Sequence, residues 1–264
     1  MTVNKVWLLI CCCCIICCCT LLAGCKSASR PEHRVAARSL EGNWVCSDVL
    51  SQLAQEKSIR HLKDYPPYTE LIFMQDSSVL LALNGQVDMI TLSYAHRHGG
   101  DALQVSDLDG NEEAYITIVN DSTLALSNSF SSDTWRYVRA SAPGAPPNGS
   151  GGIPEVFPAL LNQALISGTY TVKNAAKPYR VIFRSNGYIA YSTEFTQYAL
   201  CYNGSCNTYS HDDLIYLSNN QQGDFYGWKM QDSTLTIYSL LPVSMPDEMT
   251  EYKFDKPVLV LEKS

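Results

Sequence analysis

The chain has 264 residues, of which 46% are hydrophobic and 17% charged, and its formal net charge is −7. This length is sufficient for one large or two small domains that each bury a core. The acidic balance and the lack of a Lys/Arg cluster argue against nucleic acid as a partner, because binding a polyanion depends on clustered cations.

The first 24 residues predict an export signal. Lys5 provides the positive start, an uncharged apolar stretch covers 6–20, and small residues lead to Gly24. This order is typical of a signal peptide. Most of the 11 cysteines lie here, but consecutive cysteines on a helix point all round it, so we expect no metal site. In a signal helix cysteine acts as a small hydrophobic residue.

The string Leu22-Ala23-Gly24-Cys25 resembles the lipobox of bacterial lipoproteins. The resemblance implies cleavage after Gly24 and lipidation of Cys25 with palmitate-type chains, several of which are needed for durable membrane attachment. Because Lys26 rather than Asp follows the cysteine, it also implies the outer membrane, on either its periplasmic or its surface-exposed face. An uncleaved signal anchor is the alternative, since 6–24 is long enough to span a bilayer.

Composition divides the rest of the chain into parts. Residues 141–154 are rich in Pro, Gly and Ser, which predicts a linker. We therefore expect an N-terminal tether over 25–36, a first domain over 37–140 and a second domain over 155–264.

The two predicted domains repeat one pattern. Four pairs of segments align in the same order: 40–44 with 166–170, 70–82 with 180–192, 101–106 with 212–218, and 120–126 with 231–237. The offset stays near 110 residues through the last three pairs and is larger at the first. This order and offset predict a duplication. The first copy also has an insert, 47–64, whose apolar residues at helical spacing predict an amphipathic helix.

Each copy reads as antiparallel β-structure. Asn186-Gly187 and Asn203-Gly204 predict hairpin turns, because both turn positions need positive φ. Short strands joined by tight turns predict a meander, and closing into a barrel removes its exposed edges. The expected fold is all-β: two tandem small antiparallel meander β-barrels, with a short helix before each barrel and the helical insert in the first.

The opening Gly42-Asn43-Trp44, shortly after a predicted helical turn and before a β-meander, resembles the lipocalin-like branch of the calycin barrels. The second copy has Tyr170 in place of the tryptophan. The resemblance implies a cation stacked on each ring: Arg136 or Arg139 on Trp44, and Lys253 on Tyr170. It also implies binding, carriage or scaffolding, since a small eight-stranded barrel is either packed solid or holds one small ligand.

Cys201 and Cys206 flank the second Asn-Gly pair. If residues 203 and 204 form the loop, the two cysteines are directly opposed, which predicts a disulfide worth about 2 kcal/mol outside the cytoplasm. A redox-active pair is the less favoured alternative, because the spacing is not Cys-x-x-Cys. Cys46 then has no disulfide partner, and we expect it to be a buried core thiol.

Metal sites, cofactors and catalytic residues are not predicted. His96 and His98 at i, i+2 are a metal candidate with Asp101, but the second copy lacks the pair, which favours ordinary hairpin histidines. The acidic run 107–113 lacks the acid that a calcium loop needs at its twelfth position, where Ile118 stands. The sequence has no nucleophile elbow, zinc-protease motif or phosphate loop, so we expect no enzyme.

The aromatic residues Tyr191, Tyr198, Tyr216 and Trp228 are the candidate ligand-binding residues. Aromatic side chains on a sheet stack on sugars or line apolar pockets, although they are also ordinary strand residues. The expected function is a non-enzymatic binding module for a small apolar or glycan-like ligand. The alternative is a protein-interaction scaffold of the outer membrane with solid barrel cores and an envelope protein as partner.

Overall fold

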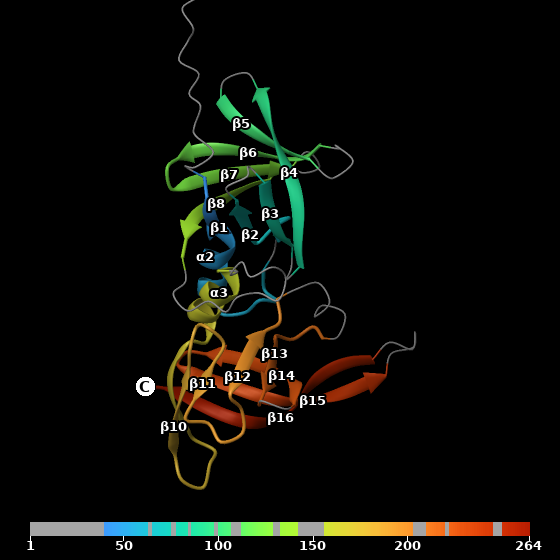
Figure 1. The fold of residues 1–264 in the computed structure, drawn as a ribbon. Helices are drawn as coiled ribbons and strands as arrows, with labels where there is room; N and C mark the ends of the chain where they lie inside the picture. The colour runs from blue at the N-terminus through green and yellow to red at the C-terminus, as the bar shows by residue number, and fades with distance from the viewer. Residues whose placement is uncertain are drawn as a thin grey trace, which may run out of the picture. The chain divides into compact units, whose positions relative to one another are not determined.

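The structure is a computed structural model of the chain (Figure 1), and it groups Arg38–Ser264 into one compact unit. It describes residues 40–62, 65–74, 78–83, 86–97, 100–106, 112–128, 133–141, 156–202, 210–219, 222–244 and 250–264. The predicted signal peptide, Cys25, the tether, the helix expected before the first barrel, His98, Cys206 and nearly all of the predicted linker lie outside these residues.

Eight antiparallel strands form a closed first barrel, because β1 pairs with both β2 and β8. The strands are β1 (Gly42–Cys46), β2 (Glu70–Phe73), β3 (Ser78–Leu83), β4 (Gln86–Arg97), β5 (Gly100–Ser106), β6 (Glu112–Asn120), β7 (Thr123–Asn128) and β8 (Thr134–Ala140).

The predicted helical insert is confirmed as α2 (Ser47–Glu56), which follows β1 directly and buries Val49 and Leu53. It is shorter than the insert itself. Lys57 adopts a left-handed conformation (φ 53°), and its N–H donates to the Leu53 carbonyl, which ends the helix.

The second sheet has the same number of strands but closes less completely. They are β9 (Gly168–Val172), β10 (Tyr179–Phe183), β11 (Ile189–Ala190), β12 (Gln197–Leu200), β13 (Leu214–Ser218), β14 (Gly223–Gln231), β15 (Thr234–Ser244) and β16 (Thr250–Lys263). The order is β11-β10-β9-β16-β15-β14-β13-β12. A single bridge between Tyr188 and Gln197 and the hydrogen bond from Ile189 N to Thr196 O (2.9 Å) join the two ends.

The two sheets match in detail as well as in strand order. The segments 120–126 and 231–237, aligned by sequence, form the β6–β7 and β14–β15 turns. Trp44 donates from Nε1 to Leu40 O (2.7 Å), and Tyr170 donates from its hydroxyl to Ile166 O (2.9 Å), each reaching back four residues. Both contacts place the ring of the Gly-x-aromatic motif in the same environment. The expected helix before the second barrel is also present, as α3 (Phe157–Leu165).

The cation expected over Trp44 is Arg139, whose Cζ lies 4.6 Å from the ring centroid. The corresponding expectation for Tyr170 is wrong. Lys253 pairs with Leu241, whereas Lys263 stands opposite Tyr170. The difference arises because β16 continues to Lys263 instead of ending shortly after Phe254.

A turn joins β10 and β11 at the predicted place, but of Asn186 and Gly187 only Gly187 has a positive φ (83°). Gly187 N donates to Arg184 O (3.0 Å), so Ser185 and Asn186 are the central residues of the turn.

β12 ends at Leu200, and Cys201 N donates to Leu214 O (3.0 Å), which places Leu214 opposite Cys201 at the end of the β12–β13 pairing. The hairpin turn predicted at 203–204 lies outside the described residues. Because Cys206 lies outside the described residues, the disulfide stays a prediction.

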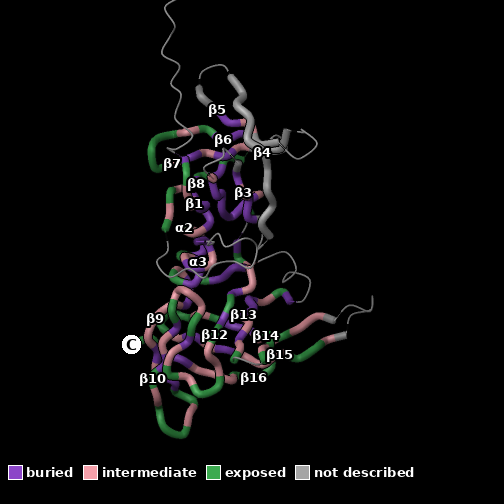
Figure 2. Tube along the Cα trace, in the orientation of Figure 1, coloured by how far each residue is buried: buried purple, intermediate pink, exposed green. Residues whose placement is uncertain are grey.

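Side chains pack the interiors of both sheets, and Figure 2 shows buried segments in strands of both. The largest fully buried ones include Trp44 and Tyr137 in the first sheet and Tyr170 and Trp228 in the second. Cys46 is buried and free, as expected.

Two buried carboxylates join the sheets. Glu70, fully buried in β2, accepts hydrogen bonds from Val156 N (2.9 Å) and Phe157 N (2.8 Å) at the start of α3. Asp213, just before β13, accepts from Ile59 N (2.8 Å) and Arg60 N (3.0 Å) beyond α2. Burial raises the pKa of both carboxyls, and the hydrogen bonds oppose that shift. Each sheet thus satisfies backbone donors of the other.

Candidate functional site

The second sheet opens where β14 and β15 separate. These strands pair only from Gly227↔Tyr238 to Gln231↔Thr234. Two register shifts flank Tyr238 in the β15–β16 pairing, and such bulges bend and twist a strand. Beyond Tyr238, β15 pairs with β16 alone, so this hairpin extends past the end of β14 (Figure 1).

The separation leaves a cleft of about 440 Å³. It is lined by Leu214, Asp224, Phe225, Tyr226, Ser239, Leu240 and Tyr252. One wall is formed by the start of β14, and the other by β15 and β16. The volume falls in the range of about 300–1,000 Å³ that is typical of small-molecule sites.

An outer aromatic face, formed by Tyr216, Phe225, Tyr238 and Phe254, adjoins this cleft. The Tyr216 and Phe225 rings meet edge-on with centroids 5.3 Å apart, and the Tyr238 and Phe254 rings stack at 4.6 Å with planes 7° apart. Phe225 is 49% exposed. Successive side chains of a strand point to opposite faces of the sheet, so Phe225 lies on the face opposite to the buried Trp228. The four rings share this outer face.

Two glycines allow these rings to lie flat on the strands. A Cβ on Gly227 would collide with the ring of Phe254, and a Cβ on Gly223 would collide with the hydroxyl end of Tyr216. Glycine is therefore required at both positions for the aromatic face to form.

The described lining residues of the cleft include one carboxylate, Asp224, and three hydroxyl groups. Asp224 is exposed on the β14 wall, and Tyr226 next to it has a raised pKa, first through burial and then through the charges of Asp224 and Glu194. Phe195, in the same loop as Glu194, packs against Tyr226 with ring centroids 5.5 Å apart. The described residues that line the cleft include no lysine, arginine or histidine.

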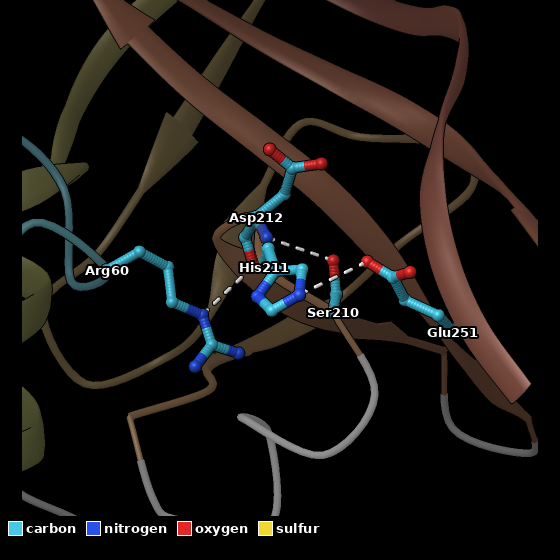
Figure 3. A network of polar contacts seen from close by, with 5 residues as sticks. All are labelled: Arg60, Ser210, His211, Asp212 and Glu251. Atoms are coloured by element: carbon cyan, nitrogen blue, oxygen red, sulfur yellow. Dashed lines mark hydrogen bonds and ion pairs between the residues drawn. The ribbon is translucent and has the colours of Figure 1, made fainter. Parts of the chain in front are cut away.

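A polar network holds the segment before β13 in place (Figure 3). Arg60 donates from Nε to Asp212 O (3.1 Å), and Asp212 N donates to Ser210 Oγ (3.0 Å). His211 Nε2 lies 3.6 Å from Glu251 Oε1 in β16. The His211 ring thus faces a carboxylate, whereas the Ser210 hydroxyl bonds a backbone amide, so this is not the arrangement of a nucleophile and its base. The network connects the strand that carries Leu214 to the strand that carries Tyr252.

The structure separates the four predicted ligand-binding residues. Tyr216 lies on the outer aromatic face. Tyr198 and Trp228 are 4% and 1% exposed, and they donate to Arg184 O (2.7 Å) and Leu214 O (3.2 Å) inside the sheet. Tyr191 is 74% exposed in a left-handed conformation (φ 64°) just after β11. Tyr198 and Trp228 are therefore core residues in this conformation.

Asp224, Phe225 and Tyr252 were not singled out from the sequence. Their proximity depends on the register shifts of β15, and no local sequence signal marks these. The neighbouring glycines in GDFYGW are the one available hint, since glycine inside a strand often marks close approach of another group.

In the part of the chain that the structure describes, no three His, Cys, Asp or Glu side chains are placed to hold a metal ion, and no helix is long and apolar enough to cross a bilayer. Comparison with protein families, characterised proteins and solved structures finds no match to this chain.

Proposed function

We propose that this protein is a lipid-anchored protein of the bacterial outer membrane whose second sheet binds a small glycan-like ligand without transforming it. The observation that carries the proposal is the cleft of about 440 Å³, which combines three aromatic side chains with a carboxylate and a hydroxyl.

Such a lining suits a sugar. The rings of Phe225 and Tyr252 offer apolar surfaces on which the C–H face of a pyranose packs, while the Asp224 carboxylate accepts hydrogen bonds from hydroxyl groups. The outer aromatic face continues this surface through Phe225, so a ligand of several sugar units has room to extend along the sheet.

The outer-membrane location in this proposal rests on the lipobox resemblance at Leu22–Cys25. The lipocalin-like resemblance is supported by two eight-stranded meanders that each begin with a Gly-x-aromatic motif. The ligand site proposed here nevertheless differs from a lipocalin lumen, because side chains pack the described interiors and the cleft lies in the wall of the sheet.

Calorimetric titration of the detergent-solubilised full-length protein with oligosaccharides tests the proposal. We expect Phe225→Ala and Tyr252→Ala each to weaken binding about tenfold, since a stacked aromatic contributes about 1 kcal/mol beyond its buried area. Tyr188→Ala is the matched control, because Tyr188 is equally exposed (49%) but does not line the cleft. No binding of any oligosaccharide at millimolar concentration contradicts the proposal.

The packed interiors favour a second candidate, a protein-interaction scaffold. The exposed Phe225 and Leu241 (49% and 54%) lie on β14 and β15, where they offer apolar contact area. Cross-linking in intact envelopes distinguishes the two: a partner captured through Leu241 but not through Tyr188 supports the scaffold.

A further inference from the structure

The charged groups in and around the cleft indicate which class of glycan it binds. Asp224 is part of the β14 wall, and Glu194 is close enough to Tyr226 to affect its hydroxyl. On the opposite wall, Ser239 donates to the carboxylate of Asp255 (3.0 Å). Among the described lining residues Asp224 is the one charged side chain, so the charge that the lining presents to an occupant is negative.

The aromatic residues reinforce this preference. The faces of tyrosine and phenylalanine rings carry partial negative charge and attract cations. Tyr226 is half-buried on the β14 side of the cleft, and Tyr252 lines the side formed by β15 and β16. A positively charged group between these rings and Asp224 would gain a charge-assisted hydrogen bond in a partly desolvated setting.

We propose that the ligand of the cleft is a glycan that carries free, protonated amino groups, with Asp224 as the residue that recognises the amine. This inference rests on the proposed function and specifies its ligand. A phosphorylated or uronic-acid glycan would meet Asp224 and Glu194 as like charges. A neutral glycan would stack on the rings but gain nothing from the carboxylates.

Two probes that differ only at the amine test the inference: the tetramer of glucosamine and the tetramer of N-acetylglucosamine. Their affinities are measured by calorimetry on the full-length protein in detergent. We expect the glucosamine tetramer to bind about tenfold more tightly at low ionic strength. The preference should shrink at about 0.5 M salt, because salt screens a partly exposed charge pair.

Variants separate charge recognition from stacking. Asp224→Asn should reduce the preference from about tenfold to about twofold, because the amide keeps the shape but not the charge. Asp232→Asn makes the same charge change in the β14–β15 turn, at the opposite end of β14 from the cleft, and should leave the preference unchanged. Tyr252→Ala should weaken both probes.

The outcomes are distinguishable. Equal affinity for the two tetramers, or a preference that Asp224→Asn does not change, overturns the inference and leaves glycan binding in place. Amine binding that Tyr252→Ala does not affect also overturns it, since the charge would then act outside the cleft. If neither tetramer nor any other oligosaccharide binds, the proposed function fails together with the inference.

Discussion

Removal of the Glu70 carboxylate tests whether its buried hydrogen bonds hold the two sheets together. Glu70→Ala leaves the N–H groups of Val156 and Phe157 without their acceptor at the start of α3, and it also removes the acceptor of the Asn43 side-chain amide. Each buried donor left without a partner costs about 1–3 kcal/mol. Part of this is offset because the carboxylate no longer has to be desolvated.

We therefore expect Glu70→Ala to lower the free energy of unfolding by about 3–5 kcal/mol, from three buried or partly buried donors at about 1–3 kcal/mol each less the regained desolvation cost. Glu70→Gln retains one acceptor oxygen and should cost about 1–2 kcal/mol. Urea unfolding followed by tryptophan fluorescence measures both changes, with Trp44 in the first sheet and Trp228 in the second as reporters.

Glu262→Ala is the matched control, because Glu262 is half-exposed and paired with Lys173 on the surface. An exposed ion pair contributes about 0–1 kcal/mol. If Glu70→Ala lowers the free energy of unfolding no more than Glu262→Ala does, the Glu70 hydrogen bonds do not hold the two sheets together. The same conclusion follows if Glu70→Ala changes the unfolding of only one of the two sheets.

Four further predictions concern other parts of the molecule. Burial raises the pKa of Glu70, so its protonated form stabilises the fold below the unfolded-state pKa, and this contribution is lost as the pH rises through the folded-state pKa. The unfolding free energy of wild type relative to Glu70→Gln should therefore rise as the pH is lowered toward the ordinary pKa of glutamate, and a constant difference would contradict this. Burial raises the pKa of the Cys46 thiol to about 12, so a thiol reagent at neutral pH should label it in urea but not in the folded protein. Arg139→Ala removes the cation over Trp44 and the hydrogen bond to Glu41 O (2.6 Å), and should lower the unfolding free energy by about 1–2 kcal/mol, whereas an unchanged value would assign Arg139 no role in stability. Cys25→Ser should abolish palmitate labelling in the host, and normal labelling would disprove the lipobox.

The sequence alone was sufficient for the features that depend on local pattern. Alternating apolar residues and Asn-Gly turns predicted antiparallel meanders, and the repeated segments predicted two of them in the same order. The spacing of apolar residues after Cys46 predicted α2. For the cation over Trp44, the family resemblance left Arg136 and Arg139 as candidates, and the pairing of β8 with β1 selects Arg139.

Features that depend on how distant segments pair were decided only by the tertiary structure. A strand's register follows from its partner, so Leu214 stands opposite Cys201, and Lys263 rather than Lys253 stands opposite Tyr170. The carboxylates of Glu70 and Asp213 look like ordinary surface acids in the sequence, and only packing of one sheet against the other buries them. The cleft likewise depends on bulges beside Tyr238 that turn β15 away from β14, and no run of neighbouring residues encodes that separation.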